Sequence, residues 1–126
     1  MSASVVICAY SSDRFGLLCD AIRSVLRQTH KDREVVVVID HNPDLLAKVA
    51  EEFPEIRTMP NEGARGLSDA RNTGMRLCTK DIIAFLDDDA TAEADWLERL
   101  VRHYGDPDIL AVGGGIVPAW PVSRPV

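Results

Sequence analysis

Short runs of consecutive apolar residues alternate along the chain with segments whose apolar positions follow a helical period. The run Ser4–Ala9 is rich in β-branched residues and predicts a strand. A helix is expected next, with Ser12 or Asp13 as its N-terminal cap. Its buried face is expected to carry four residues at helical spacing: Leu18, Ala21, Ile22 and Val25.

The same alternation continues through the middle of the chain. Glu34–Ile39 predicts a second strand, and its apolar run is typical of a parallel strand covered on both faces. Asn42 is expected to cap a second helix, with Pro43 at its first position. Ile56–Met59 predicts a short third strand. The buried stripe of the second helix is expected to contain Leu46, Val49, Ala50 and Phe53.

A loop, a helix and a strand are expected to follow. Pro60–Gly66 is rich in proline and glycine and predicts the loop. Leu67–Cys78 predicts the helix, in which the small residues Ala70 and Gly74 would allow close packing against a neighbour. Asp81–Leu86 predicts a fourth strand. The next helix is expected to present one apolar face, made of Leu97, Leu100, Val101 and Tyr104.

The last part of the chain has a weaker pattern. Ile109–Val112 predicts a fifth strand, and the proline-containing stretch Pro118–Val126 predicts irregular structure. Trp120, within that stretch, is open to two interpretations, a cap over a ligand or a packing residue. The alternation as a whole predicts an α/β fold, a three-layer sandwich around a mostly parallel sheet. A length of 126 residues suits one domain, residues 1–126.

Composition narrows the function classes. The formal net charge is −6 and no basic face is clustered in the sequence, which excludes a nucleic-acid partner. We find no signal sequence and no apolar run long enough to span a bilayer. A cytoplasmic location is therefore expected, with any membrane association left to other parts of a longer parent chain. Cys8, Cys19 and Cys78 are widely spaced and are interpreted as reduced thiols.

Polar residues follow three of the predicted strands, at the edge where parallel sheets bind ligands. Tyr10 follows the first strand, Asp40 the second, and the run Asp87–Asp89 the fourth. Adjacent carboxylates repel one another and suit Mg²⁺ or Mn²⁺, which would also bind the oxygens of a diphosphate. The alternative for this run is a solvated turn that caps the next helix.

Two further residues are open to more than one interpretation. Asp40 could accept hydrogen bonds from a nucleobase or ribose, or it could form an Asx-turn ahead of Asn42. Arg71, on the predicted helix, could face a phosphate or a base, or it could pair with Asp69 or another carboxylate.

These residues belong to segments that together resemble the inverting family-2 glycosyltransferases of the GT-A fold. The resemblance extends from about Ser4 to Trp120. It rests on five segments in the same order as in that family: Val5–Tyr10, Ser24–Thr29, Val37–Asp40, Gly66–Gly74 and Ala84–Asp89. Any one of these segments is a weak signal, and the order of all five makes the resemblance specific.

The resemblance implies roles for the candidate residues. It implies a Rossmann-like GT-A nucleotide-binding half, a nucleoside-diphosphate sugar as partner and transfer to an acceptor hydroxyl with inversion. The cofactor would be Mn²⁺ or Mg²⁺, with Asp89 as the metal ligand. The other donor-binding residues would be Ala9, Tyr10, Asp40, Arg71, Asp87 and Asp88. Neither the acceptor nor the base and sugar of the donor is indicated.

One departure from the family concerns the general base. Relatives supply an Asp or Glu from an acceptor half, and here that residue is expected beyond Val126, so that the chain would be a truncated donor-binding portion. A non-catalytic nucleotide-binding fragment is the first alternative function. A sugar nucleotidyltransferase is the second, although the segment Tyr10–Arg14 lacks the glycine-rich basic loop that such enzymes carry.

Overall fold

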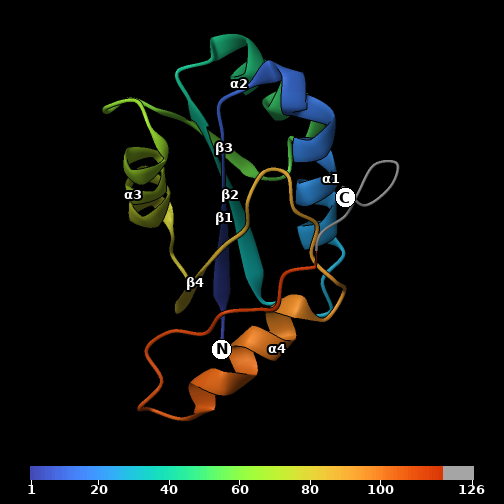
Figure 1. Cartoon of the computed structure of the whole chain (residues 1–126), viewed down its shortest axis with the longest axis vertical. Coiled ribbons are helices and arrows are strands. Elements are labelled where there is room, and N and C mark those ends of the chain that lie inside the picture. Colours follow the sequence, from blue (N-terminus) through green and yellow to red (C-terminus); the bar gives the residue numbers. More distant parts are fainter. Residues whose placement is uncertain (118–126) are drawn as a thin grey trace, which may run out of the picture.

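A single sheet of four parallel strands forms the centre of the molecule (Figure 1). The computed structural model describes residues 1–117, so the predicted irregular stretch Pro118–Val126, with Trp120, lies outside the described residues. The strand order is β3-β2-β1-β4. The strands are β1 (Ala3–Ala9), β2 (Arg33–Asp40), β3 (Arg57–Asn61) and β4 (Ile82–Phe85).

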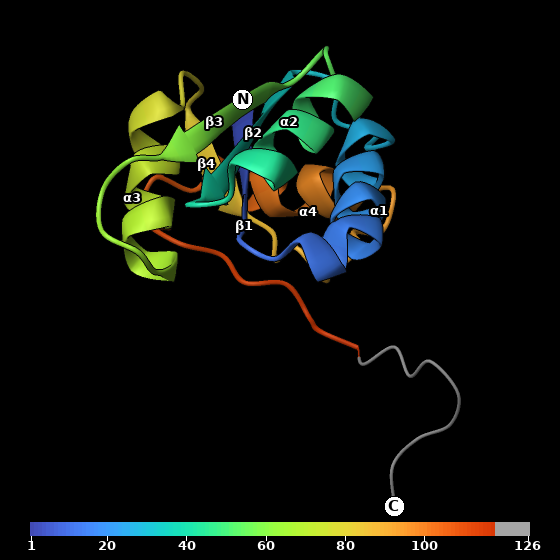
Figure 2. The ribbon, with the colours of Figure 1, turned by 90° about the horizontal axis from the view of Figure 1, so that it is seen from above.

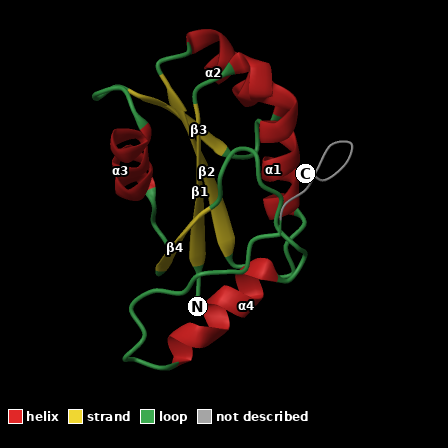
Figure 3. Ribbon diagram, in the orientation of Figure 1, coloured by secondary structure: helices red, strands yellow, loops and turns green. Residues whose placement is uncertain are grey.

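Helices cover both faces of this sheet, which confirms the predicted three-layer α/β architecture. Seen from above, α3 lies on one side of the strands, and α1 and α2 lie on the other (Figure 2). Figure 3 shows that helices follow the first three strands in turn, with α4 and an extended C-terminal stretch after β4. The helices are α1 (Phe15–Leu26), α2 (Pro43–Glu52), α3 (Leu67–Leu77) and α4 (Trp96–Arg102), with 3-10 turns η1 (Ser12–Arg14) and η2 (His103–Gly105).

The core is divided by the sheet into two clusters. Alternate residues of β1 and β2 pack against α1, α2 and α4 in the larger cluster, which includes Ile7, Val37 and Leu97. The intervening residues Val6, Val36 and Val38 form the smaller cluster with Ala70 of α3. Because β2 is buried on both faces, its side chains from Val35 to Ile39 are all buried, as the continuous apolar run predicted.

Two local predictions about the helices are confirmed. Asn42 caps α2, since its Oδ1 accepts a hydrogen bond from the Leu45 backbone N–H at 3.1 Å. Gly74 allows α3 to approach the sheet closely, because a Cβ at this position would lie 2.5 Å from Val6 Cγ1. The close approach at Gly74 thus sets how tightly α3 packs on the sheet.

Three other local predictions about the helices are wrong at particular residues. Neither Ser12 nor Asp13 caps α1, because the chain forms η1 over those residues and enters α1 with no side-chain cap. The buried stripe of α2 includes Leu45 rather than Ala50, which is exposed, whereas Val49 and Phe53 are buried as predicted. Leu100, predicted on the apolar face of α4, is only half-buried, and Leu97 and Val101 carry the packing there.

The predicted fifth strand, Ile109–Val112, is also wrong. Within residues 1–117 this segment joins no sheet, and its only backbone hydrogen bond outside regular elements is a turn from Ile109 N–H to the Asp106 carbonyl. Leu110 is 91% exposed. A run of apolar residues has β propensity, but a strand also needs a partner edge, and the sheet of the described residues ends at β4.

Candidate functional site

A cavity of about 470 Å³ lies beyond the carboxyl ends of β1, β2 and β4. The register explains its position: β4 pairs with β1 only as far as Phe85↔Val6, whereas β1 continues to Ala9 beside β2. The chain after β4 therefore turns away below the end of β1 and leaves a hollow. All seven residues predicted from the sequence line it: Ala9, Tyr10, Asp40, Arg71, Asp87, Asp88 and Asp89.

The acidic run forms a tight turn directly after β4. The Ala90 N–H donates to the Asp87 carbonyl at 3.1 Å, and the next helix begins only at Trp96. The run is thus a turn with two solvent-exposed side chains, as the alternative had it, but it does not cap a helix. The side chains of Asp87 and Asp89 are 68% and 54% exposed, whereas that of Asp88 is 10% exposed and points inward.

Arg14, at the end of η1, forms ion pairs with two of these carboxylates. Its Nη2 lies 2.7 Å from Asp88 Oδ1 and 2.9 Å from Asp89 Oδ2. The guanidinium therefore reduces the repulsion between neighbouring carboxylates. The role of Arg14 was not predicted from the sequence, because its partners are more than seventy residues away in the chain. The available signal was its place a few residues after the end of β1.

Asp88 has an incompletely satisfied carboxylate. Its Oδ2 is buried and lacks a hydrogen-bond partner among the described residues, although Oδ1 is paired with Arg14. Burial raises the pKa of Asp88 above its ordinary value, Arg14 opposes that rise, and Asp89 and Asp87 add to it. A buried acceptor without a donor costs free energy in a folded protein, so this oxygen is suited to a ligand.

Arg71 lies on α3 across the cavity from Arg14. Its Nη2 is 3.6 Å from Asp87 Oδ1, and its guanidinium carbon is 5.7 Å from the centre of the Phe85 ring. Of the two pairings considered from the sequence, the one with Asp69 is not observed, and Asp87 is the partner. The Arg71 side chain remains 41% exposed, so it is accessible to a ligand in the cavity.

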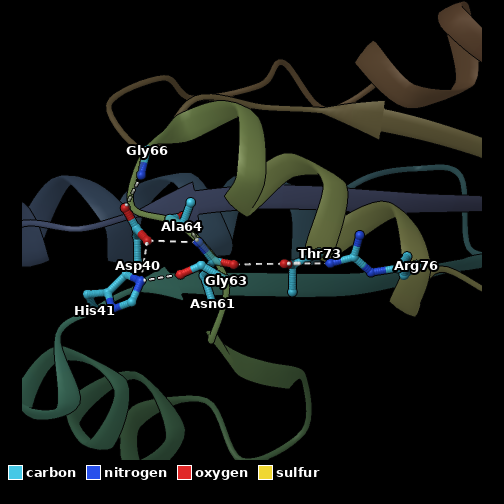
Figure 4. Close-up of polar contacts among 8 residues, drawn as sticks. All are labelled: Asp40, His41, Asn61, Gly63, Ala64, Gly66, Thr73 and Arg76. Carbon is cyan, nitrogen blue, oxygen red and sulfur yellow. Dashed lines mark hydrogen bonds and ion pairs between the residues drawn. The ribbon is translucent and has the colours of Figure 1, made fainter.

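Asp40 is the centre of a polar network that joins β2 to the loop before α3 (Figure 4). Its Oδ1 accepts from Asn61 Nδ2, and its Oδ2 accepts from the Gly66 N–H, both at 2.9 Å. Burial raises the pKa of Asp40, but these two hydrogen bonds and the nearby His41 and Arg65 together outweigh that effect, and the pKa lies below its ordinary value. The bonds reach forward along the chain to Asn61 and Gly66, and no Asx-turn bond to its own loop is formed, so that alternative is wrong.

The network extends from Asn61 into α3. Thr73 Oγ1 donates to Asn61 Oδ1 at 2.8 Å, and Arg76 in turn donates to Thr73 Oγ1 (Figure 4). Asn61 is 2% exposed and also donates to the Ala64 carbonyl. As the chain enters α3, Gly66 has a backbone φ of +125°, which residues other than glycine rarely adopt. The loop therefore reaches the cavity in a fixed conformation.

Tyr10 and Cys8 form the β1 side of the cavity. The Tyr10 ring is exposed, and its backbone carbonyl accepts from Asn42 Nδ2, so the residue that caps α2 also holds the chain after β1. Burial raises the pKa of Cys8 to about 11, which makes this thiol unreactive near neutral pH. All three cysteines are unpaired. His41 hydrogen-bonds the Gly63 carbonyl and does not line the cavity.

The donor atoms present are compatible with a divalent cation bound together with a ligand. Among the described residues, no group of three or more His, Cys, Asp or Glu side chains could hold a metal alone. Mg²⁺ and Mn²⁺, however, are commonly held by one or two carboxylates plus phosphate oxygens. Asp88 and Asp89 supply adjacent carboxylates, and the unpartnered Oδ2 of Asp88 fits that role.

Comparison with known proteins assigns the chain to a family. Residues 4–122 match the model of Glycosyl transferase family 2, and the chain belongs to this family. It is 42% identical over 129 residues to the glucosyl-dolichyl phosphate glucuronosyltransferase of Haloferax volcanii, covering 99% of this chain and 41% of that protein. It is 33% identical to an uncharacterized glycosyltransferase of Nostoc sp., covering 89% of this chain and 35% of that protein. The chain thus spans less than half the length of these relatives.

Solved structures share the fold. The mannosyltransferase PcManGT of Pyrobaculum calidifontis, in complex with GDP-Man and Mn²⁺, has a TM-score of 0.71 and 25% identity, covering 85% of this chain and 33% of that one. S. aureus TarS 1–349, in complex with UDP-GlcNAc, also has a TM-score of 0.71, at 20% identity, covering 83% and 31%. The likeness confirms the Rossmann-like GT-A fold expected from the sequence. Within residues 1–117 we find no helix that is long and apolar enough to cross a membrane.

Proposed function

We propose that this chain supplies the donor and metal site of a glycosyltransferase that moves a sugar from a nucleoside-diphosphate sugar to an acceptor hydroxyl with inversion. The single observation that carries this proposal is the arrangement of the cavity. Residues from four separate parts of the sequence line one hollow beyond the carboxyl ends of the strands.

The charge of the cavity supports a cation as part of the ligand. The lining residues include four carboxylates and two guanidinium groups, which leaves a formal net charge of −2 around a site proposed to take an anionic diphosphate. A divalent ion held by Asp88 and Asp89 would balance that charge. When bound, it would stabilise the negative charge that develops on the diphosphate leaving group.

The remaining residues have proposed roles in orienting the donor. Tyr10 presents an exposed ring suited to contact with the flat face of a base. Asp40 keeps acceptor capacity beyond its two protein hydrogen bonds, because a carboxylate can accept about four. Arg71 would contact the diphosphate or the base. In the reaction, the acceptor oxygen bonds to the anomeric carbon as the bond from that carbon to the nucleoside diphosphate breaks. The nucleoside diphosphate leaves with the electron pair, and the acceptor hydroxyl gives its proton to a general base.

The alternative of a nucleotide-binding chain without transfer activity is favoured by one observation. Each acidic side chain that lines the cavity in the described residues already has a protein partner: Arg14 for Asp88 and Asp89, Arg71 for Asp87, and Asn61 with Gly66 for Asp40. Among the described residues, no carboxylate that lines the cavity is therefore free of protein contacts to act as a base for an acceptor hydroxyl. The family match favours glycosyl transfer over the sugar nucleotidyltransferase alternative.

Calorimetry with nucleotides tests the proposal. UDP, GDP and dTDP are titrated separately into the chain, first with Mn²⁺ and then with EDTA. Metal-dependent binding of one nucleotide is expected, and it would identify the base of the donor. If a folded chain bound none of the three in Mn²⁺, the assignment of the cavity as a donor site would be wrong. Incubation of the matching sugar nucleotide with Mn²⁺, followed by assay for released nucleoside diphosphate, separates transfer or hydrolysis from binding alone.

A further inference from the structure

The end of α1 and the residues after it carry buried polar side chains that the proposed function does not use. Ser24 is 1% exposed and Gln28 is fully buried. Both lie in Ser24–Thr29, a segment that contributed to the family resemblance although no chemistry was assigned to it. Burying an amide or a hydroxyl is costly unless it is hydrogen-bonded, so the partners of these groups indicate their purpose.

Gln28 makes three hydrogen bonds, two of them to the chain beyond the acidic turn. Its Nε2 donates to the Glu93 carbonyl at 2.6 Å and to the Ser24 carbonyl at 3.0 Å. Its Oε1 accepts from the Leu97 N–H at 2.9 Å, at the start of α4. The side-chain amide is thereby largely satisfied, and it joins α1 to both ends of a five-residue stretch.

Ser24 and Thr29 fix the same stretch at two further points. The Ala92 N–H donates to Ser24 Oγ at 3.0 Å, and the Thr29 N–H donates to the Ala94 carbonyl at 2.8 Å. Residues 92–97, here called the anchored segment, are thus hydrogen-bonded to the end of α1 along most of their length. Figure 1 shows this part of the chain running beside α1 before it enters α4.

The anchored segment begins just after the acidic turn. Only Ala90 and Thr91 lie between Asp89 and the first anchored residue. On its other side, the turn is fixed by the hydrogen bond from the Leu86 N–H to the Val6 carbonyl at 3.1 Å. Adjacent carboxylates repel each other, so a turn held at one end only would spread and move its oxygens apart.

We propose that Gln28, assisted by Ser24, is a positioning residue for the Asp87–Asp89 turn. Gln28 fixes the chain that leaves the turn. It thereby keeps the carboxylates of Asp88 and Asp89 close enough to hold one divalent ion together. The effect of Gln28 on the conformation of the turn is independent of any ligand, whereas its effect on nucleotide and metal affinity rests on the proposed function.

Two serines offer a matched pair of variants. Ser24 Oγ accepts from the Ala92 N–H after the turn, and Ser4 Oγ accepts from the Lys80 N–H before β4. Both hydroxyls are buried, and each is removed by a serine-to-alanine change. Ser4→Ala alters the end of the sheet opposite the cavity. It therefore shows what the loss of a buried hydrogen bond does when the acidic turn is not involved. Gln28→Met removes the amide and keeps a side chain of similar length.

Binding is measured by calorimetry with Mn²⁺ and whichever of UDP, GDP or dTDP binds the unaltered chain. Ser24→Ala and Gln28→Met are expected to weaken binding by about tenfold, the usual effect of losing a partner behind a metal ligand. Ser4→Ala is expected to leave the affinity within about twofold, although all three variants lower Tm because each loses a buried hydrogen bond. Equal affinities in Ser24→Ala, Gln28→Met and Ser4→Ala would overturn the inference.

Amide hydrogen exchange in the ligand-free chain gives a second readout. Exchange of the Ala90 amide, which is hydrogen-bonded to the Asp87 carbonyl across the turn, is expected to be faster in Gln28→Met than in Ser4→Ala at matched stability. The reason is that the turn can then open without global unfolding. If the unaltered chain bound no nucleotide, the proposed function would fail, and exchange alone would still decide whether Gln28 positions the turn. Unchanged exchange at the turn in Gln28→Met would overturn the inference in that case too.

Discussion

Single side chains around the cavity divide into those that hold the protein together and those that are open to a ligand. Asp40 and Asp88 are both largely buried carboxylates, yet their environments differ. Asp40 has a hydrogen-bond donor on each oxygen, whereas Asp88 has an ion pair on one oxygen and none on the other within the described residues. This difference makes Asp88 the better candidate for a ligand contact and Asp40 the better candidate for a structural contribution.

Asp89→Ala is expected to weaken Mn²⁺-dependent nucleotide binding by about tenfold or more, because it removes one of two adjacent carboxylates proposed to hold the ion. Its side chain is 54% exposed, so the free energy of unfolding should change by less than about 1 kcal/mol. Calorimetry and urea unfolding measure the two quantities. Asp20→Ala is the matched control, since Asp20 is similarly exposed, at 63%, and paired with Arg23 but lies outside the cavity. Unchanged metal-dependent affinity in Asp89→Ala would remove this residue from the metal site.

Asp40→Asn is expected to reduce stability near neutral pH by about 1.5–3 kcal/mol, because an amide cannot accept from both Asn61 and the Gly66 N–H. The folded-state pKa of Asp40 is lowered, so its ionised form contributes stability above its ordinary pKa. That contribution is lost as the pH falls through the folded pKa. The difference between the two proteins should therefore shrink below about pH 4, as measured by urea unfolding across the acid range. A difference that stayed constant with pH would contradict the assignment.

The sequence predicted these positions better than it predicted their contacts. A carboxylate directly after an apolar strand can be placed at the carboxyl edge of a parallel sheet, and Asp40 and Asp87–Asp89 lie there. The roles of these residues in ligand binding stay predictions. The ion pairs of Arg14 could not be predicted, because they depend on how η1 is oriented relative to a turn far away in the sequence.

At the scale of elements, the close approach of α3 to the sheet places Arg71 over the cavity. Gly74→Ala would introduce a Cβ 2.5 Å from Val6 Cγ1 and 3.3 Å from Val38 Cγ2. We expect α3 to move outward, with a loss of about 1–3 kcal/mol in unfolding free energy and weaker nucleotide binding. Gly16→Ala is the control, because no atom lies within 4 Å of the added Cβ, and it should be neutral or stabilising by up to about 1 kcal/mol. Equal stability of both variants would show that α3 tolerates the displacement.

Helices and strands were predicted correctly where the local pattern of apolar residues agrees with the tertiary environment. β2 has an unbroken apolar run and is buried on both faces, so its pattern and its surroundings give the same answer. Ile109–Val112 has similar residues but no partner edge in the described chain, and it remains outside the sheet. Such a partner is a property of the whole sheet and cannot be read from a four-residue window.

For the molecule as a whole, the net charge predicts that nucleotide binding requires a metal ion. A chain with formal charge −6 and a net negative cavity should repel a nucleoside diphosphate unless a cation is present. Nucleotide alone, in EDTA, should therefore leave Tm almost unchanged. A ligand at a hundred times its Kd stabilises the folded state by about 2.7 kcal/mol, so nucleotide with Mn²⁺ should raise Tm by roughly 10 °C.

The thermal shift needs two controls, because Mn²⁺ alone could stabilise an acidic chain without any donor site. Mn²⁺ without nucleotide should give a smaller rise than the two together. Raising the ionic strength should reduce a non-specific effect of the ion far more than a shift that depends on coordination by Asp88 and Asp89. An equal rise for nucleotide in EDTA would mean that Arg14 and Arg71 alone neutralise the diphosphate, and the proposed metal dependence of this site would then be wrong.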